Sequence, residues 1–108
     1  MDDLLDTATF DGMKELLEDE FPSFLEMFFS ENQDALDRIK NGLAASDANE
    51  IKAASHNLKS STGYLGAMQL SEFARQMEEQ AATGDISGLD AIYTQAQDML
   101  DAIKAQVS

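Results

Sequence analysis

The sequence predicts an all-α protein, an antiparallel four-helix bundle with an additional short N-terminal helix. Apolar residues recur at the three- and four-residue spacing of helices along almost the whole chain, and no segment alternates with the period of two that is typical of strands. One proline and six glycines in 108 residues leave little room for the many turns of a sheet. The connections between the helical segments are short, which favours antiparallel neighbours.

The first half of the chain predicts two helices. A short helix is expected over about residues 10–18. Its inner face consists of Phe10, Met13 and Leu17. Pro22 suits the first turn of a longer helix, where a backbone N–H is not needed. The apolar stripe of that helix consists of Leu25, Phe28, Phe29, Leu36, Ile39 and Leu43. A break follows at Ser46 and Asp47, either of which can cap the next helix.

Three more helices are expected in the second half. The third covers about residues 48–63, and its inward residues are Ile51, Ala54, Ser55, Leu58 and Thr62. The fourth covers about residues 67–82, and its inward residues are Leu70, Phe73, Ala74, Met77 and Ala81. Gly84 ends it and Asp85 is expected to start the last helix. The stripe of the last helix consists of Ile86, Leu89, Tyr93, Ala96, Leu100, Ile103 and Val107.

The charge balance is strongly acidic. The chain has 21 acidic and 7 basic residues, for a formal net charge of −14. This charge repels phosphate backbones and anionic lipid surfaces, so neither nucleic acid nor a membrane is an expected partner. The longest apolar runs are far shorter than the ~20 residues that cross a bilayer. The acidic start lacks the basic segment of a secretory signal, and with no cysteine in the chain we expect a cytoplasmic protein.

The same composition limits the enzyme chemistry that the chain can perform. It contains one histidine, no cysteine and neither of the phosphate-binding motifs GxxxxGK[ST] and GxGxxG. A self-sufficient kinase, ATPase or dehydrogenase is therefore not expected, and no cofactor is implied. A metal site is not expected either, because a second histidine and thiolates are absent. The many carboxylates supply candidate pairs for hydrolysis, but no pair stands out.

His56 is the residue that the sequence marks as a candidate reactive side chain. At about 100° per residue it lies roughly 150° from the centre of the apolar stripe of the third helix, so it points to water. The same face carries Lys52, Lys59, Ser60 and Gly63. The imidazole is thus a nucleophile with two cations nearby and small residues ahead of it. On this pattern alone, an exposed histidine without a function is the competing interpretation.

The local sequence resembles the signature of histidine phosphotransfer (HPt) domains. Residues 56–67, HNLKSSTGYLGA, are similar to the family pattern H-x-L-K-G-[SA]-S, two variable residues and L-G-A. The matching positions are His56, Leu58, Lys59, Ser61, Leu65, Gly66 and Ala67. Ser60 replaces the glycine that the family favours, and Thr62 replaces its second serine. Neither departure removes a reacting group, so both bear on partner preference.

The resemblance implies one HPt domain over residues 1–108, with a phosphoacceptor core at about residues 48–85. It implies that His56 accepts and donates a phosphoryl group through Nε2, that Lys59 offsets the phosphate charge, and that Ser60 leaves access for a partner.

The residues around this core are expected to support it. Lys52 and Gly63 share the face of His56, and the antiparallel helix that follows places Arg75 and Glu78 on the facing side. Glu78 is expected either to orient the imidazole or to form a surface ion pair with Lys52 or Lys59.

The implied function is that of a phosphocarrier in a two-component phosphorelay. A phosphoryl group would pass through His56 between a hybrid sensor histidine kinase, or its receiver aspartate, and a response-regulator receiver domain. The chain would not be an enzyme, and the Mg²⁺ that the reaction needs is expected on the partner receiver domain. The initial methionine and the compact length favour a free-standing protein, which we expect to be a bacterial monomer.

Two other functions remain as alternatives. The first is a non-catalytic acidic helical-bundle interaction module, which binds a regulator without phosphotransfer. Met27 and Met68 fall off their helix stripes, so they are expected to be exposed and would suit adaptable binding. The second is the dimerisation and phosphoacceptor domain of a sensor kinase, whose H-[ED]-x-[RKT]-P box is not matched at His56.

Overall fold

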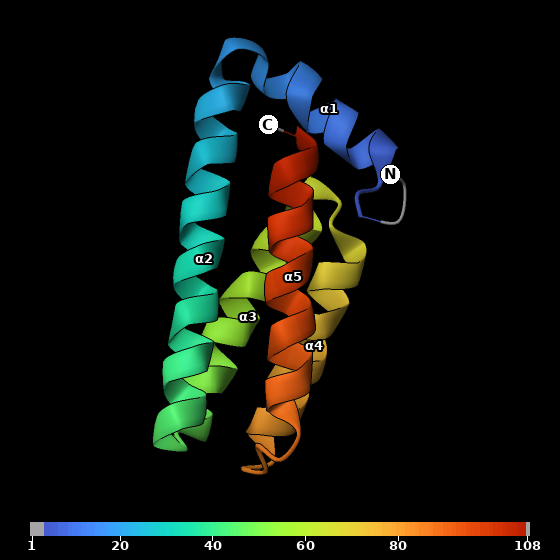
Figure 1. Ribbon diagram of the computed structural model, residues 1–108. Coiled ribbons are helices and arrows are strands. Elements are labelled where there is room, and N and C mark those ends of the chain that lie inside the picture. The colour runs from blue at the N-terminus through green and yellow to red at the C-terminus, as the bar shows by residue number, and fades with distance from the viewer. Residues whose placement is uncertain (1–3, 108) are drawn as a thin grey trace.

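The computed structural model describes residues 4–107, which form a four-helix bundle with a fifth helix across one end (Figure 1). The helices are α1 (Thr7–Leu17), α2 (Phe21–Ala45), α3 (Ala48–Leu65), α4 (Met68–Ala82) and α5 (Leu89–Val107). Helices α2 to α5 alternate in direction, and each packs against its neighbours in a closed ring, with α5 returning to α2. The molecule measures 41 × 23 × 20 Å. The predicted fold class is confirmed.

The first helix begins three residues earlier than the sequence predicts. The Asp6 carboxylate caps it by accepting a hydrogen bond from the Thr9 N–H at 3.1 Å. The Asp6 N–H donates to the Gly66 carbonyl at 2.7 Å, which fixes the start of α1 to the turn between α3 and α4. A 3-10 turn, Glu18–Glu20, leads into α2, and Pro22 lies in the first turn of α2 as predicted.

The helix boundaries around the candidate site follow from local capping. Ser46 takes a left-handed conformation at the end of α2, and the Asp47 carboxylate caps α3 by accepting from the Glu50 N–H at 3.1 Å. Helix α3 continues two residues past the predicted end. Gly66, with φ at 88°, then reverses the chain into α4.

The predicted start of the last helix is wrong. The Asp85 carboxylate accepts a hydrogen bond from the Ser87 N–H at 2.9 Å inside a turn, so it closes a loop rather than capping a helix. Gly88 has a positive φ, and α5 begins after it, at Leu89.

The core forms from the predicted stripes. On α3 every inward residue is buried, namely Ile51, Ala54, Ser55, Leu58 and Thr62. Asn32 of α2 is a buried polar residue that the stripe did not include. Its side-chain amide donates to the Phe28 carbonyl at 2.8 Å and to the Ser61 hydroxyl at 2.9 Å, and so links α2 to α3. The rotation of α3 about its axis is therefore fixed by both apolar and polar contacts.

The surface also follows the prediction in two places. Met27 and Met68 are 59% and 55% exposed, as their positions off the stripes indicated. Within the described part of the chain, no helix is both long and apolar enough to cross a membrane.

Leu58 tests the rotation of α3, because it is fully buried beneath the helix that carries His56. We expect Leu58→Ala to lower the free energy of unfolding by about 2–5 kcal/mol through lost burial and a residual cavity. Urea unfolding followed by circular dichroism measures the change. Asn57→Ala, at the exposed neighbouring position, is the control and should change the value by no more than about 0.5 kcal/mol. Equal stability of the two variants would contradict this packing.

Candidate functional site

His56 lies in the middle of α3, and 59% of its side chain is exposed. The predicted outward orientation is thus confirmed, and it has a simple cause. The residues that flank it, Ser55 and Leu58, are buried in the bundle, so the part of the helix surface between them faces water. The imidazole is presented on a packed helix rather than on a loop.

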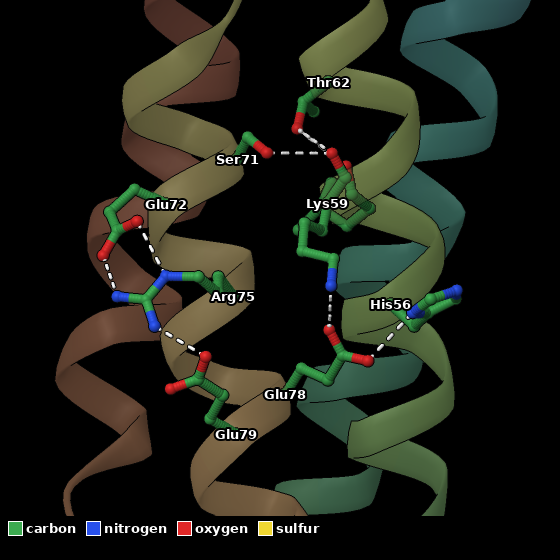
Figure 2. Close-up of polar contacts among 9 residues, drawn as sticks. His56, Lys59, Thr62, Ser71, Glu72, Arg75, Glu78 and Glu79 are labelled. Atoms are coloured by element: carbon green, nitrogen blue, oxygen red, sulfur yellow. Dashed lines mark hydrogen bonds and ion pairs between the residues drawn. The ribbon is translucent and has the colours of Figure 1, made fainter.

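Glu78 of α4 joins His56 to Lys59 (Figure 2). Its Oε2 lies 2.8 Å from the His56 Nδ1, and its Oε1 lies 2.7 Å from the Lys59 Nζ. The Glu78 side chain is 17% exposed, which is far less than the side chain of His56. The two roles expected for Glu78 therefore coexist, because one oxygen contacts the imidazole and the other forms an ion pair with Lys59.

The protonation of this pair follows from the charge on Glu78. Partial burial raises the pKa of Glu78, but the contacts with Lys59 and His56 outweigh burial and hold the pKa below its usual value. The carboxylate is therefore ionised at neutral pH, and an ionised carboxylate only accepts hydrogen bonds. Nδ1 of His56 must then carry the proton and donate it. In the neutral ring the lone pair is left on Nε2, which Figure 2 shows at the end of the ring away from Glu78.

A further hydrogen bond joins α3 to α4 beside this pair. The Ser71 hydroxyl of α4 donates to the Lys59 carbonyl of α3 at 2.9 Å (Figure 2). Within α3, the Thr62 hydroxyl donates to the Leu58 carbonyl at 2.7 Å. Ser71 is not predicted from the sequence, because a single serine on an amphipathic helix gives no signal of the carbonyl to which it donates. Gly63 lies opposite Ser71, where an added Cβ would meet the hydroxyl at an ordinary 3.6 Å.

Arg75 departs from its predicted position. Its guanidinium binds Glu72 and Glu79 on its own helix, with 2.6 Å to the Glu79 carboxylate, and Figure 2 shows it turned away from His56. The hydrogen bonds from Arg75 and Gln76 lower the pKa of Glu72 to about 2. Carboxylates three residues before and four residues after an arginine are its natural partners on a helix, and they hold it on the far side of α4.

Two shallow hollows flank the imidazole. One, of about 520 Å³, is lined by Asn49, Lys52, Ala53, His56, Asn57 and Glu78. The other, of about 590 Å³, follows the groove between α2 and α3 and includes Asn57, Ser60, Ser61 and Tyr64 with Glu31 and Asp34. Ser60 is exposed at this groove, one turn beyond His56. Residues 4–107 contain no group of three or more metal-binding side chains placed to hold an ion.

The comparisons with known proteins agree with this geometry. The model of the Hpt domain family matches residues 23–106, from the start of α2 to the end of α5. Histidine-containing phosphotransfer protein B (HptB) from Pseudomonas aeruginosa PAO1 has a similar structure, with a TM-score of 0.92, 24% sequence identity, and coverage of 95% of this chain and 90% of that one. At this identity the likeness shows a shared fold alone. No curated protein sequence matches the chain. The family match spans all four helices of the bundle and contains His56, Lys59 and Glu78, and the chain belongs to the Hpt domain family.

Proposed function

We propose that the chain carries a phosphoryl group on Nε2 of His56, as the phosphocarrier of a two-component phosphorelay. The observation that carries this proposal is the hydrogen bond from Nδ1 to Glu78. It leaves one ring nitrogen with a lone pair, on a side chain that is 59% exposed. A nucleophile that is held on a packed helix and exposed to solvent can attack a phosphoryl group on a partner protein, and a partner can in turn take that group back.

The transfer step needs little from this chain beyond the positioned nitrogen. The Nε2 lone pair attacks the phosphorus of an aspartyl phosphate on the partner receiver domain. The N–P bond forms as the bond between phosphorus and the aspartyl oxygen breaks, and the aspartate leaves as a carboxylate. The Nδ1 proton stays in its hydrogen bond to Glu78 throughout. The same step in reverse returns the phosphoryl group to a receiver aspartate, and the receiver would supply the Mg²⁺.

The surroundings of the imidazole favour one direction of approach. Glu78 and Lys59 close the side that faces α4. The side that faces α2 opens onto the groove at Ser60, where the exposed Tyr64 supplies an apolar ring and Glu31 and Asp34 supply negative charge. Arg38 also lines this groove, but its charge is paired with Glu50. We infer that the receiver docks over Ser60 and presents a partly apolar, basic surface. A cytoplasmic monomer fits this role, because the face around His56 is left for the partner.

A second function, binding without phosphotransfer, is favoured by one observation. Met27, Met68 and Leu16 are more than half exposed, which suits an adaptable apolar contact. This function does not use the Glu78 contact with His56, so a transfer assay separates the two.

The phosphocarrier function is tested by label transfer. The chain is mixed with receiver domains that carry radiolabelled aspartyl phosphate, and acid-labile label on the chain is measured. We expect label on the wild type and none on His56→Gln, whose fold should be unchanged by circular dichroism because residue 56 is exposed. Transfer to neither protein from any receiver in a broad panel would favour the binding module.

Ser60→Arg tests the direction of approach. The bulky side chain should fill the groove beside His56 and slow transfer by at least about tenfold, which corresponds to ~1.4 kcal/mol in the barrier. The free energy of unfolding should change by no more than about 0.5 kcal/mol. Ser87→Arg, at the exposed turn before α5, is the matched control and should transfer at the wild-type rate. Full activity in both variants would overturn the docking route over Ser60.

Glu78→Gln tests the role of the carboxylate. The amide keeps the size of the side chain but loses the charge that holds the Nδ1 proton. We expect transfer to slow by about tenfold, in line with the loss of one charge-assisted hydrogen bond. Two-dimensional ¹H–¹⁵N spectra of the ring should change from one dominant tautomer to a mixture. Glu79→Gln removes the neighbouring carboxylate, which contacts Arg75, and should leave both the rate and the ring spectrum unchanged.

A further inference from the structure

The two lysines beside His56 differ in whether their charge is paired with a carboxylate. The Lys59 Nζ lies 2.7 Å from the Glu78 Oε1, on the α4 side of the imidazole, where Nδ1 also points (Figure 2). To reach a group bound to Nε2, this ammonium would have to leave Glu78, whose side chain is only 17% exposed. Separating such a pair is unfavourable, because it leaves a poorly hydrated charge without its partner. The charge of Lys59 is therefore already paired with that of Glu78.

Lys52 lies one helical turn before His56, and its charge is not paired within residues 4–107. It lines the same hollow as the imidazole, and Lys59 does not line that hollow. The Lys52 side chain is exposed, and within residues 4–107 it forms no ion pair or side-chain hydrogen bond. The nearby arginines are engaged, since Arg38 binds Glu50 at 2.8 Å and Arg75 binds two carboxylates of α4.

We propose that Lys52 is the cation that meets the phosphoryl group on His56, and that Lys59 is a positioning residue that acts through Glu78. This inference rests on the proposed function. It reverses the assignment that the family resemblance implies, in which Lys59 offsets the phosphate charge.

The chemistry of the hollow supports the assignment. The phosphoryl oxygens on Nε2 carry about two negative charges when fully ionised, and because the ring keeps its Nδ1 proton, a chain of net charge −14 becomes about one charge more negative. Side chains four residues apart on a helix are neighbours, and the flexible lysine stem lets the ammonium swing over one turn. The amides of Asn49 and Asn57 line the same hollow and can donate hydrogen bonds to phosphoryl oxygens. Glu78 also lines this hollow, but its two oxygens already contact His56 and Lys59. Lys52 is thus the mobile charge of a small surface beside the ring that can receive an anion.

The experiment uses the whole chain and phosphoramidate, a small phosphoryl donor that needs no partner protein. Lys52→Gln, Lys59→Gln and Lys104→Gln each remove one positive charge, and Lys104, which is exposed on α5, is the matched control. The rate of phosphohistidine formation and the pH titration of the phosphoryl group are followed by ³¹P NMR. The tautomer of the unphosphorylated ring is followed by ¹⁵N NMR.

We expect Lys52→Gln to slow phosphohistidine formation by about two- to fivefold, the effect of one exposed charge pair. The ³¹P titration midpoint should rise by about 0.3 to 0.7 pH units, because a nearby cation favours the dianion. The ring tautomer should not change. Lys59→Gln should alter the tautomer without raising the midpoint, and Lys59→Arg should restore the tautomer. Salt at 1 M, where the Debye length is about 3 Å, should remove most of the Lys52 effect.

The opposite pattern overturns the inference. If Lys52→Gln behaves like Lys104→Gln while Lys59→Gln raises the midpoint and leaves the tautomer unchanged, Lys59 is the cation at the phosphoryl group. A wild-type chain that takes no phosphoryl group on His56 from phosphoramidate or from any receiver domain would instead contradict the proposed function. The two failures are therefore distinguishable.

Discussion

The chemistry proposed for this surface depends on the two contacts of the Glu78 carboxylate. It comes from α4, yet both of its oxygens are occupied by residues of α3, His56 on one side and Lys59 on the other. A carboxylate so placed performs two tasks. It fixes the proton on one imidazole nitrogen, and it neutralises the lysine that the sequence places closest to the ring. The other ring nitrogen, Nε2, is left with the lone pair, and Lys52, which forms no ion pair within residues 4–107, lines the hollow beside the ring.

That interaction depends in turn on the register between α3 and α4. The chain reverses within two residues, and Gly66 makes this possible with a φ of 88°, at a point where a Cβ would lie 3.0 Å from the Asp6 carbonyl oxygen. One turn further along, the Ser71 hydroxyl bonds the Lys59 carbonyl and prevents the helices from sliding. Buried side chains such as Leu58 fix the rotation of α3. The bundle thus acts as a rigid mount for one exposed imidazole, and the donor or acceptor of the phosphoryl group can come from outside.

Most of this helical scaffold can be predicted from the sequence, because helices that pack in a bundle require apolar residues at a regular spacing. Apolar spacing gives the helices, their inner faces and the outward direction of His56, each to within a few residues. It fails where local hydrogen bonding decides. Asp6 and Asp85 are equally plausible caps by residue type, yet the Asp6 carboxylate starts a helix while that of Asp85 closes a turn. Arg75 lies level with His56 along α4, but two carboxylates of its own helix hold its guanidinium elsewhere. The different engagement of Lys52 and Lys59 depends on one side chain of another helix, which no spacing rule specifies.

We propose that Glu78 reserves Nδ1 for a proton and leaves Nε2 for phosphorus. The most direct measurement is a long-range ¹H–¹⁵N correlation spectrum of the phosphorylated wild-type chain, with ³¹P–¹⁵N coupling resolved on the ring. We expect phosphorus coupling at Nε2 and a proton on Nδ1 that shows a hydrogen-bonded shift. Phosphorus coupled to Nδ1 would contradict it, because that nitrogen could then no longer donate to Glu78.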